Sequence, residues 1–248
     1  MGLGAKQVRR RPIIHTVPSQ PIERAPLFAD VHVTFSRDTA KLLRSWGAKD
    51  VRIIPPAVQV PTNVQGDRAR FGIPADKRAI LFAGDMIEPG GAETLGAALE
   101  RMRDVVGVFA YRDKGGEVQE MVERVTSRIG DRAIMLGVVD DVFALMKSVD
   151  LNCLAASDLT GKVDFPYVIL ESMALGTPVA VGDMSPLNEL GSESDGVLKV
   201  SYSPRQLSRQ LERLLKDETR LAELADRGQK AARERFSLNA LGAAYSAL

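Results

Sequence analysis

The chain has 248 residues, of which 45% are hydrophobic and 26% are charged, and both shares are ordinary for a folded globular protein. The formal net charge is only +1, so the overall charge gives no sign of a nucleic-acid partner. No apolar run approaches membrane-spanning length, and the single cysteine, Cys153, excludes an internal disulfide. We therefore expect a cytoplasmic protein that has no transmembrane segment and does not bind nucleic acid.

Short apolar runs alternate with longer amphipathic stretches, and this alternation is typical of βαβ units around a parallel sheet. In chain order, the expected strands are 12–16, 31–35, 51–54, 79–83, 105–110, 133–136, 151–154, 178–181 and 197–200. The expected helices are 37–46, 92–103, 117–129, 142–148, 167–175, 204–216, 219–235 and 238–247. The pattern predicts the α/β class.

A boundary falls near residues 55–66, where the sequence IPPAVQVPTNVQG is rich in proline and lacks periodicity. After it, strands and helices alternate to about residue 200, which is enough for one complete doubly wound domain. Before it stand only two or three strands and one clear helix, too few for an independent domain. If the chain stands alone, we expect exposed apolar surface around residues 12–35.

The stretch 158–181 reads DLTGKVDFPYVILESMALGTPVAV and is the most informative part of the chain. It runs from a loop through Pro166 into a short helix that carries one acid, Glu171, and then into an apolar strand. A helix that starts just past a strand end offers unpaired backbone N–H groups and the positive end of its dipole, which suit a phosphate. A carboxylate one turn inside can accept hydrogen bonds from sugar or ribose hydroxyls.

In residue order and spacing, this stretch resembles the nucleotide-sugar site of the retaining glycosyltransferase family 4, which has the two-domain GT-B architecture. The segment VTFSRDTAKLLRSWGAKDVRIIPPAV resembles the family's passage from the acceptor domain to the donor domain, and the tail AARERFSLNALGAAYSAL resembles its final helix. The resemblance implies a Rossmann-like doubly wound parallel sheet. Residues 1–60 would be a remnant of the acceptor domain and linker, 61–235 the nucleotide-sugar-binding domain, and 236–248 a helix that packs back toward the N-terminal part.

The resemblance also implies transfer of a sugar from a UDP- or GDP-sugar to a glycan or lipid-linked acceptor, in glycan or polysaccharide biosynthesis, without a cofactor or metal. Most of the acceptor pocket would come from a partner chain, from a second copy or from upstream sequence. The basic cluster of Lys6 and residues 9–11 could contact anionic lipid at the inner membrane face. A solvated terminus is the favoured interpretation of this cluster.

Two cations of the family pattern are absent from the segment FAGDMIEPGGAET. Gly84 and Gly91 match the family, but Asp85 stands at the arginine position and Gly90 at the lysine position. These cations neutralise the diphosphate of the donor in relatives, whereas an acid at this place opposes its binding unless other groups compensate.

Three other cations follow strands or precede the helix start and are candidates for this compensation. For Arg112, a phosphate contact and an ordinary solvated loop charge are equally supported. For Lys114 the solvated charge is favoured, and for Lys162 a phosphate contact is favoured.

The family's Glu-x7-Glu motif is half present, because its second acid matches Glu171 and its first falls on Val163. The resemblance places Glu171 on the ribose hydroxyls. The neighbouring Asp164 could reach the sugar and is also in the right place to cap the helix that follows Pro166; the two roles are compatible, and we keep Asp164 as a sugar contact. We include the residues from Lys162 to Tyr167, and Phe165 among them, in the predicted site.

The remaining candidates for the site are one glycine and two histidines. Gly137 corresponds to the place where relatives contact the base, although glycine is also normal turn chemistry there. His15 and His32 do not align with the family's histidine, and we interpret both as core residues. No metal-ligand spacing occurs among the histidines and the cysteine.

Two other classes of function compete with the glycosyltransferase. The first is a non-catalytic binding or scaffold subunit that kept the fold, favoured by the three lost charged positions. The second is a sugar-nucleotide epimerase of the same architecture. A dinucleotide-dependent dehydrogenase is a poor alternative, because the chain lacks G-x-G-x-x-G after the first strand of the larger domain.

Overall fold

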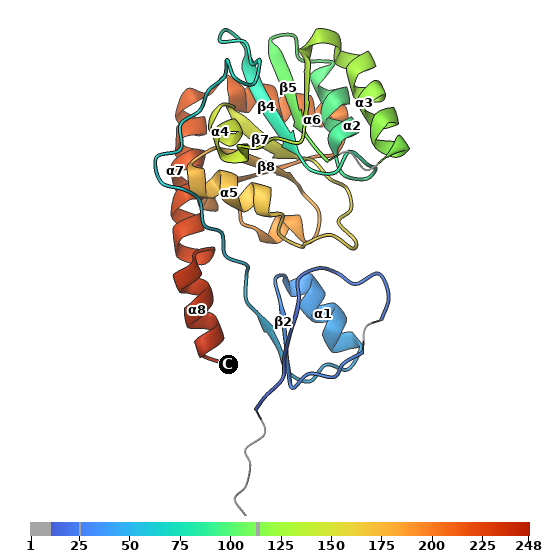
Figure 1. Cartoon of the computed structure of the whole chain (residues 1–248), viewed down its shortest axis with the longest axis vertical. Helices are drawn as coiled ribbons and strands as arrows, with labels where there is room; N and C mark the ends of the chain where they lie inside the picture. Colours follow the sequence, from blue (N-terminus) through green and yellow to red (C-terminus); the bar gives the residue numbers. More distant parts are fainter. Residues whose placement is uncertain (1–10, 25, 113–114) are drawn as a thin grey trace, which may run out of the picture.

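The computed structural model describes residues 11–24, 26–112 and 115–248, which form two parallel β-sheets with helices around them (Figure 1). The small sheet has the strand order β1-β2-β3, and the large sheet has the order β6-β5-β4-β7-β8-β9. The strands are β1 (Ile14–Val17), β2 (Val31–Thr34), β3 (Val51–Ile53), β4 (Arg78–Ala83), β5 (Val105–Ala110), β6 (Ala133–Gly137), β7 (Leu151–Leu154), β8 (Val179–Gly182) and β9 (Val197–Val200).

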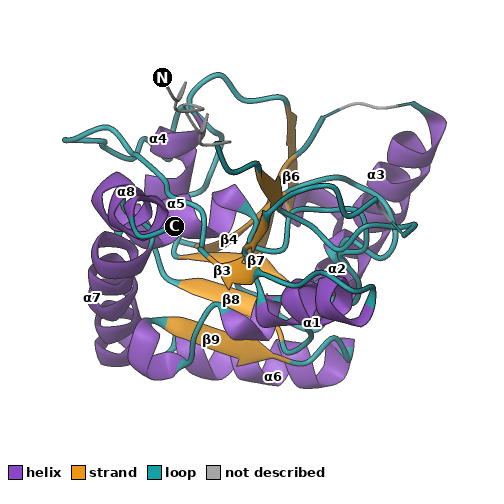
Figure 2. Cartoon of the chain, turned by 90° about the horizontal axis from the view of Figure 1, so that it is seen from below, coloured by secondary structure: helices purple, strands orange, loops and turns teal. Residues whose placement is uncertain are grey.

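The helices are α1 (Arg37–Ser45), α2 (Ala92–Leu99), α3 (Gly116–Ile129), α4 (Val142–Lys147), α5 (Tyr167–Leu175), α6 (Pro204–Leu215), α7 (Glu218–Arg235) and α8 (Leu238–Ser246). Around the large sheet, α2, α3 and α6 lie on one side, while α4, α5 and α7 lie on the other (Figure 2). The predicted doubly wound parallel sheet is confirmed. Among the described residues, no helix combines the length and the apolar character needed to cross a bilayer.

Helix α2 ends four residues earlier than the sequence pattern predicted. It stops at Leu99, because the chain turns there toward β5 and the side chain of Arg132 takes up the exposed carbonyl groups. The Arg132 guanidinium donates to the carbonyl oxygens of Leu99 at 2.9 Å and Val105 at 3.3 Å, and also to that of Met102. A distant side chain thus performs the capping that the last turn of a helix requires.

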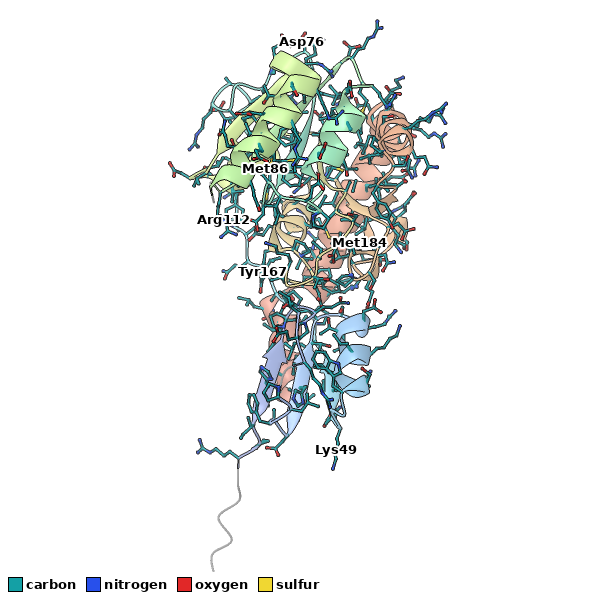
Figure 3. The ribbon with its side chains drawn as sticks, turned by 90° about the vertical axis from the view of Figure 1, so that its right-hand side faces the viewer. Lys49, Asp76, Met86, Arg112, Tyr167 and Met184 are labelled. Atoms are coloured by element: carbon teal, nitrogen blue, oxygen red, sulfur yellow. The ribbon has the colours of Figure 1, made fainter. Side chains whose placement is uncertain are left out.

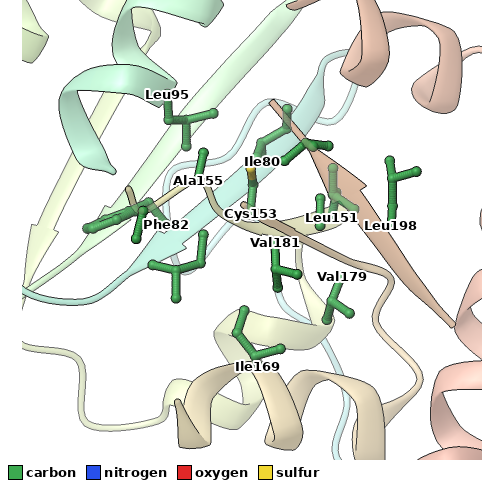
Figure 4. Packing of buried hydrophobic residues seen from close by; sticks show 14 of the residues in the cluster. Ile80, Phe82, Leu95, Leu151, Cys153, Ala155, Ile169, Val179, Val181 and Leu198 are labelled. Carbon is green, nitrogen blue, oxygen red and sulfur yellow. The ribbon is translucent and has the colours of Figure 1, made fainter. Parts of the chain in front are cut away.

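The core of the large sheet is built from apolar side chains of adjacent strands and of the helices that cover them (Figure 4). Phe82, Leu151 and Val181 are fully buried and come from β4, β7 and β8. Each such side chain contributes roughly 1.5–3 kcal/mol through removal of its apolar surface from water. Cys153 is part of this core, and burial raises the pKa of its thiol to about 12, so it is a packing residue rather than a reactive one.

The small sheet is covered on one face by α1 and on the other by α8, which continues the line of α7 down the molecule (Figure 1). Val31 and Val33 pack against Tyr245 of α8, and the Tyr245 hydroxyl lies 2.8 Å from the Thr16 hydroxyl. Around the outer strand β1 and in the segment that follows it, several apolar side chains are exposed, as predicted. Ile13, Ile14, Ile22 and Phe28 are between 41% and 79% exposed.

Candidate functional site

A cavity of about 430 Å³ lies at the carboxyl ends of the central strands of the large sheet. The strand order reverses at β4, because β5 lies on one side of it and β7 on the other. The loops that follow β4 and β7 therefore diverge and leave a crevice, which is where open α/β sheets bind their ligands. The lining residues are Phe82, Ala83, Gly84, Asp85, Ile87, Glu88, Pro89, Gly90, Arg112, Leu154, Asp158, Leu159, Thr160, Lys162, Val163, Pro166, Tyr167 and Val168.

The first turn of α5 forms one wall of this cavity. Pro166 is the N-cap residue, and its side chain cannot accept a hydrogen bond from the helix. The backbone of Pro166 still starts the helix, since its carbonyl oxygen accepts from the amide of Ile169 at 3.0 Å. A helix start without a side-chain cap, facing a cavity through Tyr167 and Val168, is suited to an anionic group.

Two of the three candidate cations meet at the end of β4. Arg112 lies 3.3 Å from Asp85 through its guanidinium NH2 and the Oδ1 atom, and the Lys162 ammonium contacts the Oδ2 atom of the same carboxylate. Figure 3 shows Arg112 and Tyr167 on the same side of the molecule. Lys114, like Lys6, Arg9 and Arg10, lies outside the described residues.

Glu171 lies on α5, one turn inside the helix, and is half-buried. Within the described part of the chain, its carboxylate has neither a hydrogen bond nor an ion pair, and burial raises its pKa above the ordinary value. Glu171 does not line the cavity itself. A half-buried acid without a partner beside a cavity is a candidate for contact with a ligand.

Asp164 occupies a different place from the one expected. Its side chain is 1% exposed and accepts hydrogen bonds from the Ser36 hydroxyl at 2.5 Å and the Thr39 hydroxyl at 2.7 Å. Burial raises the pKa of this carboxyl, although both hydrogen bonds act against that shift. The interpretation of Asp164 as the cap of α5 is wrong, because the residue binds the start of α1 instead and lies outside the lining of the cavity.

The loop that carries Lys162 is held by the segment that follows β1. Ser19 and Val163 form an antiparallel bridge. The amide of Asp164 donates to the carbonyl oxygen of Pro18 at 2.9 Å, and the amide of Gly161 donates to that of Gln20 at 3.2 Å. Val163, at the place of the family's first acid, thus takes part in backbone pairing between the two halves of the molecule. No local feature of the sequence indicates this contact, because its two sides are far apart in the chain.

The other predicted site residues divide between the cavity and its surroundings. Gly84, Pro166 and Tyr167 line the cavity. Phe165 is buried in the core, with its ring centroid 6.3 Å from that of Phe236. Gly137 ends β6 with a φ of +64°, outside the lining of this cavity.

The histidines belong to the small sheet and not to the cavity. His15 and His32 face each other across β1 and β2, with ring centroids 5.8 Å apart. His32 is buried, which agrees with its interpretation as a core residue. Across the described ranges, no group of three metal-ligating side chains comes together.

A doubly wound parallel sheet with a ligand-sized cavity at its switch point is the arrangement in which open α/β proteins bind their ligands. The family model described as "Glycosyl transferases group 1" matches residues 63–235, and the chain belongs to this family. The match covers the whole large sheet and the cavity.

Two relatives show the similarity at the level of sequence. The lipopolysaccharide core biosynthesis glycosyltransferase LpsE of Rhizobium meliloti (strain 1021) is 26% identical over 200 residues, which are 79% of this chain and 57% of the relative. The D-inositol 3-phosphate glycosyltransferase of Thermobispora bispora is 32% identical over 216 residues, which are 78% of this chain and 48% of the relative. The chain thus spans about half the length of these relatives.

Solved structures show the same fold. Anabaena HepE in complex with UDP has a TM-score of 0.82 at 18% identity, and the match covers 96% of this chain and 73% of that one. The sucrose-phosphate synthase of Thermosynechococcus elongatus has a TM-score of 0.77 at 22% identity, covering 89% of this chain and 58% of that one. These neighbours establish the GT-B type of α/β fold for the chain.

Proposed function

We propose that this chain is the donor-binding part of a retaining glycosyltransferase similar to family 4. It binds a nucleotide sugar in the cavity at the carboxyl ends of β4, β5 and β7. The observation that carries the proposal is the uncapped start of α5, which shares one cavity with Lys162 and Arg112 while the unpartnered Glu171 lies one turn behind. The neighbour HepE was crystallised with UDP and with UDP-glucose, which supports a donor of this type.

In this proposal the diphosphate lies against the first turn of α5, and Glu171 accepts hydrogen bonds from the ribose hydroxyls. The bond between the sugar carbon and the diphosphate oxygen breaks, and a bond from that carbon to the acceptor oxygen forms on the same face. The acceptor's proton passes to the departing phosphate. The helix end and the nearby cations stabilise the charge that develops on the diphosphate. No side chain is assigned as a base, and no cofactor or metal is assigned.

In this proposal, the chain itself provides only a small part of the acceptor site. We assign residues 1–60 to a remnant of the acceptor domain and linker, 61–235 to the donor domain, and 236–248 to the helix that returns to the first part. The remaining acceptor surface would come from a partner chain, a second copy or upstream sequence. The acceptor would be a glycan or a lipid-linked molecule in glycan or polysaccharide biosynthesis, reached in the cytoplasm or at the inner membrane face.

A non-catalytic scaffold subunit is the second candidate. The observation that favours it is the pairing of Asp85 with both cations of the cavity, together with Val163 in place of an acid. A scaffold protein would keep the fold without binding a nucleotide.

Calorimetric titration with UDP, GDP and their common sugar conjugates separates the two candidates. The donor site predicts binding with a Kd on the order of micromolar for one nucleotide and at least a tenfold loss in Glu171→Gln, which keeps the shape of the side chain but removes its charge. Glu120→Gln, at an exposed position on α3, is the matched control and should bind like the wild type. Absence of binding to every nucleotide would favour the scaffold.

A further inference from the structure

Asp85 has an unusual position for an acid, because it lies in the cavity beside the uncapped start of α5. Its side chain is 13% exposed, whereas those of Arg112 and Lys162 are 71% and 44% exposed. The carboxylate is therefore largely buried in the cavity wall, and the two cations contact it from the exposed rim of the cavity. Both cations lie on loops that follow strand ends, so their convergence on the end of β4 comes from the sheet topology.

The other acids of the cavity have different partners. Glu88 pairs with Arg124 of α3 at 2.9 Å, which draws it away from the two rim cations. Asp158 accepts hydrogen bonds from the amide and the hydroxyl of Thr160, each at 2.7 Å. Within the described ranges, Asp85 is the acid that pairs with Lys162 and Arg112.

A phosphate group in this cavity would need the same two cations. Guanidinium and ammonium groups bind carboxylates and phosphates through the same charge-assisted hydrogen bonds, so the two anions compete. The diphosphate of a nucleotide sugar carries about two negative charges, which Lys162 and Arg112 together could balance. Asp85 is in contact with both cations, and the charges of these three side chains sum to a single positive charge.

We infer that Asp85 is an internal competitor of the donor's phosphates and limits the affinity of the cavity for them. Lys162 and Arg112 form the phosphate clamp, and they bind a diphosphate only by leaving Asp85. The ligand class is a nucleoside diphosphate or its sugar conjugate. This inference rests on the proposed function, since it places the donor's phosphates in the same cavity.

The test is titration of wild type and Asp85→Asn with UDP and GDP at low ionic strength. Asparagine keeps the size of the side chain and removes the charge that faces the phosphates, so about tenfold tighter binding is expected. Asp131→Asn makes the same change in net charge at the opposite, amino end of β6 and should leave the affinity unchanged. Asp85→Ser gives a second variant, and thermal denaturation checks that both are folded.

A double-mutant cycle with Lys162→Gln tests the shared cation directly. Loss of Lys162 should weaken UDP binding several-fold more in the Asp85→Asn background than in wild type, because only in that background is the ammonium released from the carboxylate. Additive effects would overturn the competition, and so would weaker or unchanged binding by folded Asp85→Asn and Asp85→Ser while wild type binds. If neither wild type nor the Asp85 variants bind UDP or GDP, the proposed function fails and the inference fails with it.

Discussion

At the scale of a single residue, Gly91 is the point where the loop after β4 meets the chain that follows β7. It is the N-cap of α2, with a φ of +98°, in the left-handed region that favours glycine. A Cβ atom at this position would lie 2.7 Å from the carbonyl carbon of Ala155 and 2.7 Å from the amide nitrogen of Ala156. The loop after β4 therefore approaches the chain after β7 at a distance that only glycine permits.

We predict that Gly91→Ala lowers the free energy of unfolding by at least about 1–2 kcal/mol, since left-handed strain alone costs that much for a residue with a Cβ. The clash with rigid backbone adds to this cost and should also shift the loop that carries Asp85. Urea denaturation measures the change. Gly242→Ala is the control, because a Cβ in α8 meets nothing within 4 Å and alanine favours a helix. Equal stability of the two variants would contradict the close approach.

At the scale of elements, the loop before α5 depends on α1. Thr39 belongs to α1, is fully buried, and donates its hydroxyl to Asp164 at 2.7 Å. Glu189, in the short turn Leu187–Glu189, accepts from the amides of Arg37 at 2.7 Å and Asp38 at 3.0 Å. Two acids of the large part of the molecule thus hold the start of α1, where the helix dipole favours negative charge.

Thr39→Val should reveal how far this contact fixes the loop that carries Lys162. Valine keeps the shape of threonine but removes one of the donors to a buried carboxylate, at an expected cost of about 1–3 kcal/mol in unfolding free energy. Nucleotide affinity should fall several-fold as well. Thr39→Ser retains the hydroxyl and should bind nucleotide like the wild type. Denaturation and titration of both variants provide the measurement, and equal nucleotide affinity in the two would show that the hydroxyl does not position the loop.

The same elements show what local sequence can predict. Strands β5, β7 and β9 and helix α5 have the predicted bounds, because buried parallel strands are continuous apolar runs with clear punctuation. The predicted end of α2 was wrong because the side chain that caps the helix, Arg132, comes from the short turn Gly130–Arg132 before β6. Long-range contacts of this kind leave no periodic signal.

In the candidate site, the place of Arg112 followed from the end of its strand, and that of Lys162 from the start of the helix after it. The role of both residues in binding stays a prediction. The placement of Asp164 did not follow, because its partner Ser36 is 128 residues away in the chain. A short acid before a proline looks locally like a helix cap. Only the packing of α1 on the large part of the molecule gives it another partner.

At the scale of the whole molecule, the small sheet should make stability depend on pH. His32 is buried, and no hydrogen-bond partner of its ring nitrogens occurs within the described residues. Burial lowers its pKa below the ordinary value of 6.5, and the neighbouring His15 lowers it further. Below pH 6.5 the unfolded chain therefore takes up a proton that the folded chain resists. The contribution of His32 is fully present above that pH and is lost as the pH falls toward the lowered value.

Two carboxyl groups act in the opposite direction at lower pH. Burial raises the pKa of Asp164 and of Glu171, so the folded chain binds those protons more readily than the unfolded chain does. Their effect begins as the pH falls toward the raised values, whereas the histidine effect begins already at 6.5.

We expect the melting temperature to fall between about pH 7.5 and about pH 5.5, and His32→Leu to reduce this fall by removing the titrating group. Thermal denaturation at the two pH values tests this. If the melting temperature of His32→Leu falls by the same amount between the two pH values, the pH dependence of stability does not come from His32 at the buried face between β2 and α1.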